Sequence, residues 1–286
     1  MVNQLQGCDS LRPVFVSQNV NAEVKSYVKI DSFDEITHSF GPHDLVLLDL
    51  DDTLIDSKAM LGSKAWRSYI VKATKYDLQG NWHDILSLFV AQNYPVHAIE
   101  ETTTRFIEEL QRKGVMVLGF TARERNQWYY TPCDDIDILT TTQLNSCGID
   151  FTKTNIREPY QYLSKTPECF ENVIFANTDT KGEYIPKLLK KPHMYPERVF
   201  FFDDKESQVT TVDEALSKLG IDHQCFLYTA IDKKTELFDP LIANIQLYFL
   251  KKDDAILSDE DARKIAERNP EKDAEFYLQI SLELFR

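Results

Sequence analysis

The stretch LVLLDLDDTL, residues Leu45–Leu54, is the one that decides the fold, because an apolar run ends directly on a cluster of acids. Its first four residues predict a buried strand of a parallel sheet, where near-continuous apolar runs are typical. Asp49, Asp51 and Asp52 then place three carboxylates within four positions. Carboxylates held this close repel one another, so one becomes protonated or a cation lies between them. The stretch therefore predicts a strand end that is also a charged site.

Composition limits the class of protein. With 286 residues, of which 43% are hydrophobic, the chain can form one large α/β domain or a core domain with an insert. Lys and Arg number 32 against 46 Asp and Glu, which gives a net charge of −14. The phosphates of nucleic acids and anionic membranes repel such a chain, so neither is expected as a partner. The sequence predicts no oligomeric state.

The cysteines and the N-terminus bear on where the protein works. The five cysteines include no CxxC pair, which argues against a zinc knuckle or a redox motif. They are Cys8, Cys133, Cys147, Cys169 and Cys225. Reduced thiols suit a cytosolic setting, and no stretch reaches the roughly 20 apolar residues of a membrane span. Residues 1–16 show no basic start before an apolar run, so no cleavable secretion signal is visible. We expect a cytoplasmic protein, or one exported without such a signal.

Alternation along the chain predicts an α/β fold. Five apolar runs read as strands, at residues 45–49, 115–120, 173–176, 199–203 and 225–229. Helical patterns lie between them, at residues 99–114, 182–191 and 210–220. Strands that alternate with helices predict a Rossmann-like parallel sheet with helices on both faces.

Three regions depart from this alternation. Residues 63–78 and 81–95 look helical and predict a small helical cap insert after the first core strand. A further helix is expected within residues 124–148, followed by a loop or hairpin. In the tail, Ser258 and Asn269 are expected to start two capped helices. The predicted divisions are an N-terminal extension at 1–43 that packs on the core, the core at 44–55 and 99–240, the cap insert at 56–98 and C-terminal helices at 241–286.

Polar residues gather at one edge of the predicted sheet, because ligands in open parallel sheets bind at the carboxyl ends of the strands. The residues expected there are Asp49, Asp51, Thr121, Lys181, Asp203 and Asp204. Clustered carboxylates are ligands that Mg²⁺ prefers, and protein-bound Mg²⁺ is often shared with a substrate phosphate. A carboxylate can also attack phosphorus, while a lysine and a hydroxyl hold the phosphoryl oxygens. The set predicts Mg²⁺-assisted phosphoryl chemistry.

Four motifs in this order resemble those of the haloacid dehalogenase superfamily, whose members are mostly Mg²⁺-dependent phosphatases. They are DLDDT at 49–53, FTAR at 120–123, the segment around Lys181 and FFFDDK at 200–205. The resemblance covers roughly residues 44–230. LGSKAW at 61–66 and TKGE at 180–183 are similar to a poorly characterised bacterial branch of the superfamily, and this likeness gives no substrate.

The resemblance implies a role for each site residue. Asp49 would be the nucleophile and Asp51 the general acid and base. Thr121 and Lys181 would bind the phosphoryl group. The Mg²⁺ ligands would be Asp49, the main-chain carbonyl of Asp51, Asp203 and Asp204. An acid at position 51 favours phosphoryl transfer, since the hydrolytic dehalogenases lack one there.

The expected function is hydrolysis of a phosphomonoester through an aspartyl-phosphate, with a phosphorylated small molecule or a phosphopeptide as substrate. A binding or effector protein that keeps the fold with little or no catalysis, or a phosphotransferase, is the alternative. Lys165 is a second candidate for the motif lysine, because it also lies between the second and fourth motifs. Asp52 is expected to be a helix-start acid. Arg123 and Arg125 are expected either to contact the substrate or to have solvated or structural roles.

Overall fold

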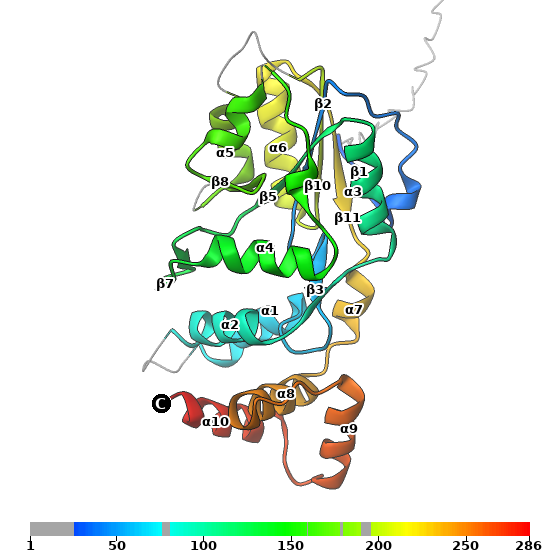
Figure 1. Cartoon of the computed structure of the whole chain (residues 1–286). Helices are drawn as coiled ribbons and strands as arrows, with labels where there is room; N and C mark the ends of the chain where they lie inside the picture. Colours follow the sequence, from blue (N-terminus) through cyan, green and yellow to red (C-terminus); the bar gives the residue numbers. More distant parts are fainter. Residues whose placement is uncertain (1–25, 76–80, 159, 178–179, 190–195) are drawn as a thin grey trace, which may run out of the picture.

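A mostly parallel seven-stranded sheet forms the centre of the molecule, with helices on both faces (Figure 1). The computed structural model describes residues 26–75, 81–158, 160–177, 180–189 and 196–286. The predicted α/β fold with a Rossmann-like parallel sheet is confirmed. The first 25 residues of the predicted N-terminal extension, which include Cys8, lie outside the described residues.

The strand order is β1-β11-β10-β2-β5-β9-β8. The bounds are β1 Val28–Ile30, β2 Asp44–Leu48, β5 Met116–Thr121, β8 Cys169–Phe170, β9 Val173–Phe175, β10 Arg198–Asp203 and β11 Asp222–Tyr228. All neighbours pair in parallel except β8, which runs antiparallel to β9. The N-terminal extension thus contributes the edge strand β1 beside β11.

Side-chain alternation along the central strand β2 explains how both faces are covered. Val46 and Leu48 pack in one apolar cluster with α3 (Thr102–Arg112) and α4 (Ile136–Ser146). Leu45 and Leu47 pack in a second cluster with α5 (Lys181–Leu188) and α6 (Glu206–Leu219). Because successive side chains of a strand point to opposite faces, a strand that is apolar throughout requires cover on both sides.

The helix predicted within residues 124–148 is present as α4. A correction concerns the segment between β5 and α4, which the sequence pattern assigned to this helix. Its first part is a hairpin of β6 (Gln127–Trp128) and β7 (Thr131–Pro132), and α4 begins only at Ile136. Aromatic residues favour strands, and Pro132 interrupts a helical pattern. Short 3₁₀ turns lie at Phe33–Glu35, Phe151–Lys153 and Tyr160–Lys165.

The cap insert leaves and re-enters the core at one place. The antiparallel strands β3 (Ile55–Ser57) and β4 (Val96–Ala98) pair there, and α1 (Lys64–Ala73) and α2 (Trp82–Asn93) lie between them. Figure 1 shows both helices beyond the strand ends of the sheet. After β11, the short helix α7 (Asp232–Glu236) leads the chain toward this cap.

The C-terminal helices pack on the cap insert and enlarge it. They are α8 (Pro240–Asp253), α9 (Asp259–Arg268) and α10 (Ala274–Phe285). Trp66 and Val90 of the insert share one apolar cluster with Ile245 and Leu278 of the tail. The buried Gln246 side chain accepts a hydrogen bond from the Leu61 main chain at 3.0 Å. The cap therefore consists of five helices from two distant parts of the sequence (Figure 1).

The two predicted helix starts in the tail differ in outcome. Ser258 caps α9 by accepting a hydrogen bond from the Asp261 main chain, as expected. The prediction for Asn269 is wrong, since this residue ends α9. Asp273 caps α10 instead, and its carboxylate accepts from the Phe276 main chain at 2.8 Å.

Candidate active site

Neighbouring parallel strands bring the predicted acids together. The Asp49 main chain continues the pairing of β2 with β10 by donating to the Phe202 carbonyl at 2.9 Å. Asp203 and Asp204 follow at the end of β10, so their carboxylates lie beside that of Asp49. One oxygen from each of the three lies within 4.8 Å of the others, and all three residues are buried.

The N-terminus of α5 delivers a lysine to this cluster. Thr180 caps the helix in a reciprocal capping box with Glu183, which fixes the position of Lys181 in the first turn. The Lys181 ammonium donates to Asp203 at 2.6 Å and to Asp49, and the side chain is 1% exposed. Lys165, the other candidate, is exposed in a 3₁₀ turn. The structure thus brings Lys181, and not Lys165, to the acids.

Ionising both Asp49 and Asp204 is unfavourable in the protein without a bound cation. Burial and the neighbouring Asp203 raise the pKa of Asp49 to about 8, although Lys181 opposes this shift. Burial, Asp52 and Asp203 raise the pKa of Asp204 to about 6 against the opposing charge of Lys64. A divalent cation would favour the charged forms of both groups.

The donor set fits Mg²⁺. Three carboxylates converge from two rigid strand ends, and carboxylate oxygens are the ligands this ion prefers. Asp49, Asp203 and Asp204 would hold the ion. The predicted contribution of the Asp51 main-chain carbonyl stays a prediction.

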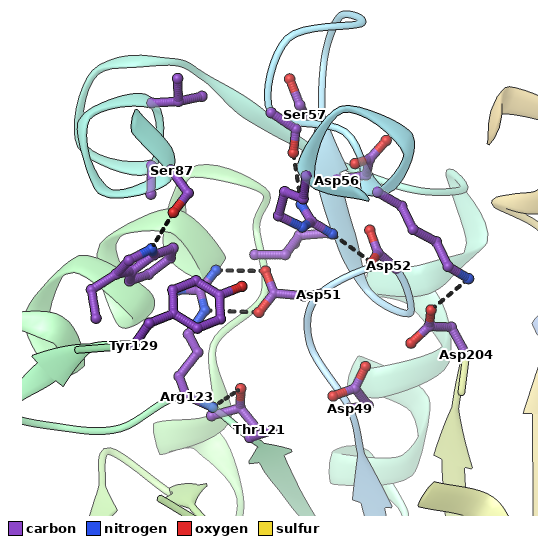
Figure 2. Close-up of a pocket in the computed structure, with 18 of the residues that line it drawn as sticks. Asp49, Asp51, Asp52, Asp56, Ser57, Ser87, Thr121, Arg123, Tyr129 and Asp204 are labelled. Carbon is purple, nitrogen blue, oxygen red and sulfur yellow. Dashed lines mark hydrogen bonds and ion pairs between the residues drawn. The ribbon is translucent and has the colours of Figure 1, made fainter. Parts of the chain in front are cut away.

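The Asp51 side chain points away from the other acids and toward Arg123 (Figure 2). Arg123 binds it in a bidentate ion pair, with nitrogen–oxygen distances of 2.7 and 2.8 Å. Burial disfavours the carboxylate, but Arg123 outweighs burial and holds the pKa of Asp51 at about 2. Arg123 is itself fixed by the Thr140 hydroxyl and the Gln143 carbonyl, each at 2.9 Å. The Asp51 carboxylate can therefore take up a proton only after this ion pair opens.

Two threonines lie at this edge of the sheet. Thr121, at the end of β5, is buried, lines the cavity and accepts a hydrogen bond from the Arg123 main chain at 3.1 Å. Thr53 donates to Asp49 at 2.9 Å. The sequence reasoning gave Thr53 no role, although its place four residues after Asp49 in a tight turn was a usable signal. The turn is visible in the main-chain bond from Leu54 to the Leu50 carbonyl at 2.9 Å.

The cap supplies cations that the sequence reasoning missed. Lys64 pairs with Asp204 at 2.8 Å, and Arg67 pairs with Asp52 at 2.5 Å. Asp52 has a positive φ of 67° in a turn, so the expectation of a helix-start acid is wrong. Arg125 pairs with Asp137 and does not line the cavity, which gives it a structural role.

A cavity of about 520 Å³ lies between the strand ends and the cap, a volume typical of small-molecule sites. Asp49, Asp51, Thr121, Lys181, Asp203 and Asp204 line its core side. Trp66, Val90 and Tyr94 line its cap side, and Trp128 of the hairpin lines it too. Ser87 of the cap and Tyr129 of the hairpin also line the cavity (Figure 2). The structure therefore brings all six predicted site residues to one cavity.

Comparison with known proteins gives relatives of uncharacterised activity. The profile of a family described as "Protein of unknown function (DUF2608)" matches residues 22–263. A "Putative outer membrane protein" of Chlamydia trachomatis is 22% identical over 232 residues, 79% of this chain and 84% of that protein. One of Chlamydia pneumoniae is 23% identical over 222 residues, 76% and 80% of the two chains. No solved structure matches. Within the described residues, no helix combines the length and apolar character needed to cross a membrane.

Proposed function

We propose that this chain, which belongs to the DUF2608 family, is a Mg²⁺-dependent phosphatase of the haloacid dehalogenase type. The observation that carries the proposal is the convergence of Asp49, Lys181 and Asp203 on the wall of one cavity. A buried nucleophile, a cation for the phosphoryl oxygens and a set of metal ligands are the parts that phosphoryl transfer requires.

In the first step a carboxylate oxygen of Asp49 attacks phosphorus. A phosphorus–oxygen bond to Asp49 forms and the bond to the leaving oxygen breaks. Asp51, which takes up a proton from the solvent once Arg123 has moved to the phosphate, gives that proton to the leaving oxygen. In the second step water attacks phosphorus, Asp51 takes a proton from the water, and the bond to Asp49 breaks. Inorganic phosphate and the alcohol are the products, and both acids return to their starting forms.

Lys181, which pairs with Asp49 and Asp203, would bind the phosphoryl oxygens. The Thr121 hydroxyl, at the neighbouring strand end, would hold a second phosphoryl oxygen. Bound Mg²⁺ would offset the charge of the phosphoryl group and of the carboxylates. Arg123 would transfer from Asp51 to the incoming phosphate, and this exchange frees Asp51 to carry a proton.

The Asp51–Arg123 ion pair also favours a second candidate. A protein in which this pair never opens would bind phosphorylated ligands without turning them over, as a binding or effector protein on the same fold. Release of phosphate over many turnovers would exclude this candidate. A phosphotransferase would instead deliver the phosphoryl group to an added alcohol.

The experiment is a phosphate-release assay on the full chain with p-nitrophenyl phosphate, phosphorylated metabolites and phosphopeptides. Turnover that requires Mg²⁺ and stops on addition of a chelator is the expected result. Binding of these compounds to the folded protein without any release of phosphate would contradict the proposal and support the binding protein.

We also propose that the chain is exported. Support comes from the relatives in Chlamydia, which are named outer membrane proteins. Recovery of the chain exclusively from the cytoplasmic fraction of its native cells would contradict this.

A further inference from the structure

We propose that the substrate is a small phosphomonoester whose leaving group contains an aromatic ring, and that Tyr129 stacks on this ring. The inference rests on the proposed phosphatase function and adds a substrate class to it. Tyr129 forms the turn of the β6–β7 hairpin and lies beside the Asp51–Arg123 pair at the cavity wall (Figure 2).

The backbone of Tyr129 is strained. Its φ of 53° is in the left-handed region, which bulky side chains rarely adopt and which tends to mark functional sites. Contacts to α2 hold the hairpin in this conformation. The Tyr130 main chain donates to Asp84 at 2.9 Å, the Trp128 indole donates to Ser87 at 2.9 Å, and the His83 ring meets the Tyr129 ring edge-on at 4.5 Å.

The consequence of this strain is a ring placed on the cavity rather than in a core. Tyr129 lines the cavity and remains 45% exposed, so its ring is not fully used in packing. The adjacent Tyr130 is 83% exposed and does not line the cavity. The exposed part of the Tyr129 ring takes no part in packing, whereas a ligand ring would cover it.

The cap side of the cavity is suited to the same kind of group. Trp66, Val90 and Tyr94 are nearly or fully buried and give this wall an aromatic and apolar character. An aromatic leaving group would match this apolar wall.

The size of the cavity favours a small molecule over a protein substrate. Its volume of about 520 Å³ suits a compound of drug size or smaller. The C-terminal helices back the cap insert through the shared apolar cluster and through Tyr94, whose hydroxyl donates to the Leu257 carbonyl at 2.5 Å. The apolar wall is therefore held from behind.

The test compares benzyl phosphate with cyclohexylmethyl phosphate, because the two alcohols are alike in size and basicity and differ in aromaticity. We expect the wild type to have the higher kcat/KM for benzyl phosphate. Tyr129→Gly should remove this preference by lowering kcat/KM for benzyl phosphate up to about tenfold, the range of aromatic pair interactions. Tyr129→Phe should keep the preference, and Tyr130→Ala is the matched control on the same turn.

A stability measurement separates ligand contact from a structural role. Glycine adopts a positive φ without strain, which offsets the lost ring contact with His83, so Tyr129→Gly should melt close to the wild type. Equal loss of kcat/KM for both compounds, with or without a large drop in melting temperature, or equal turnover of phosphotyrosine peptides and benzyl phosphate would overturn the inference. Binding of benzylphosphonate, which cannot be hydrolysed, gives a readout that is independent of turnover. If benzylphosphonate binding depends on Tyr129 but benzyl phosphate is not hydrolysed, the ring site stands and the proposed phosphatase function is rejected.

Discussion

Lys181 is the residue that links the acids of β2 and β10. It is buried between Asp49 and Asp203, and its charge compensates both. Burial disfavours the ammonium, but Asp203 and Asp49 outweigh burial and raise the pKa of Lys181, so the ammonium stays charged. Its removal would leave two buried acids without their cation.

The variant Lys181→Ala should lower kcat/KM by roughly 10²–10³-fold, because a charge-assisted contact to the phosphoryl group is lost. It should also weaken the binding of vanadate. Lys165→Ala is the matched control, since Lys165 is exposed, and it should change neither quantity. If Lys165→Ala strongly lowers kcat/KM and Lys181→Ala does not, the motif lysine is assigned to the wrong residue.

For single residues, the sequence predicts the site residues that directly follow buried strands. It does not predict the site residues that the cap contributes. Asp49, Thr121 and Asp203 were predictable, because each stands at the carboxyl end of an apolar run. Lys64 and Arg67 reach core acids only because α1 folds back over the sheet edge. No local pattern encodes that closure, and the same holds for the pairing of Arg123 with Asp51.

Among the elements, α5 is held against α6 by a glycine. A Cβ at Gly182 would lie 2.4 Å from the Thr211 carbonyl oxygen of α6, closer than packed atoms allow. Glycine therefore permits the close approach of the two helices that places the neighbouring Lys181. This gives a physical reason for the Lys-Gly pair in the TKGE segment.

Gly182→Ala should destabilise the fold by about 1–3 kcal/mol and reduce turnover, because α5 must move away and carry Lys181 with it. Chemical denaturation and the phosphate-release assay measure the two effects. Gly41→Ala is the control, since its added Cβ would meet Asp44 at an ordinary 3.8 Å. Wild-type stability in the Gly182 variant would contradict the close packing of α5 on α6.

The success of prediction differed between element types. The buried strands were predictable because short apolar runs bounded by turn residues and acids are typical of a parallel sheet. The hairpin at Gln127–Pro132 was wrongly predicted as helix because a strand of two residues has no measurable periodicity. The start of α10 was misplaced because Asn269-Pro270 satisfies a capping pattern that tertiary packing assigns to Asp273.

For the whole molecule, the joint cap is the feature that sequence could not predict. The insert and the C-terminal helices looked like separate units, because the two are separated by the entire core in sequence. The apolar character of the tail residues Ile245 and Leu278 predicts that they are buried. The sequence pattern does not show that they pack on the cap insert.

Binding of Mg²⁺ should stabilise the molecule in a pH-dependent way. At a concentration of 100 times its Kd, Mg²⁺ contributes about 2.7 kcal/mol, which corresponds to a rise of several degrees in melting temperature. Folding raises the pKa of Asp49 to about 8, so protonated Asp49 stabilises the metal-free protein. This stabilisation by Asp49 is fully present below about pH 4 and is lost as the pH rises through about 8. Mg²⁺ requires the ionised form, so its effect should be larger at pH 8 than at pH 6.

Calorimetry of the chelated and Mg²⁺-saturated protein at both pH values measures this effect. If the Mg²⁺-saturated protein melts at the same temperature as the chelated protein, Asp49, Asp203 and Asp204 do not bind Mg²⁺.

The most direct test of the central claim is phosphate release from p-nitrophenyl phosphate by the wild type and by Asp49→Asn, each with Mg²⁺. Asp44→Asn is the control, because Asp44 is a buried acid at the opposite end of the same strand and pairs with Arg198. The account predicts Mg²⁺-dependent turnover by the wild type and the control, and none above background by folded Asp49→Asn, whose amide cannot form the aspartyl-phosphate. Undiminished turnover by Asp49→Asn, or no turnover by the folded wild type with Mg²⁺, would contradict it.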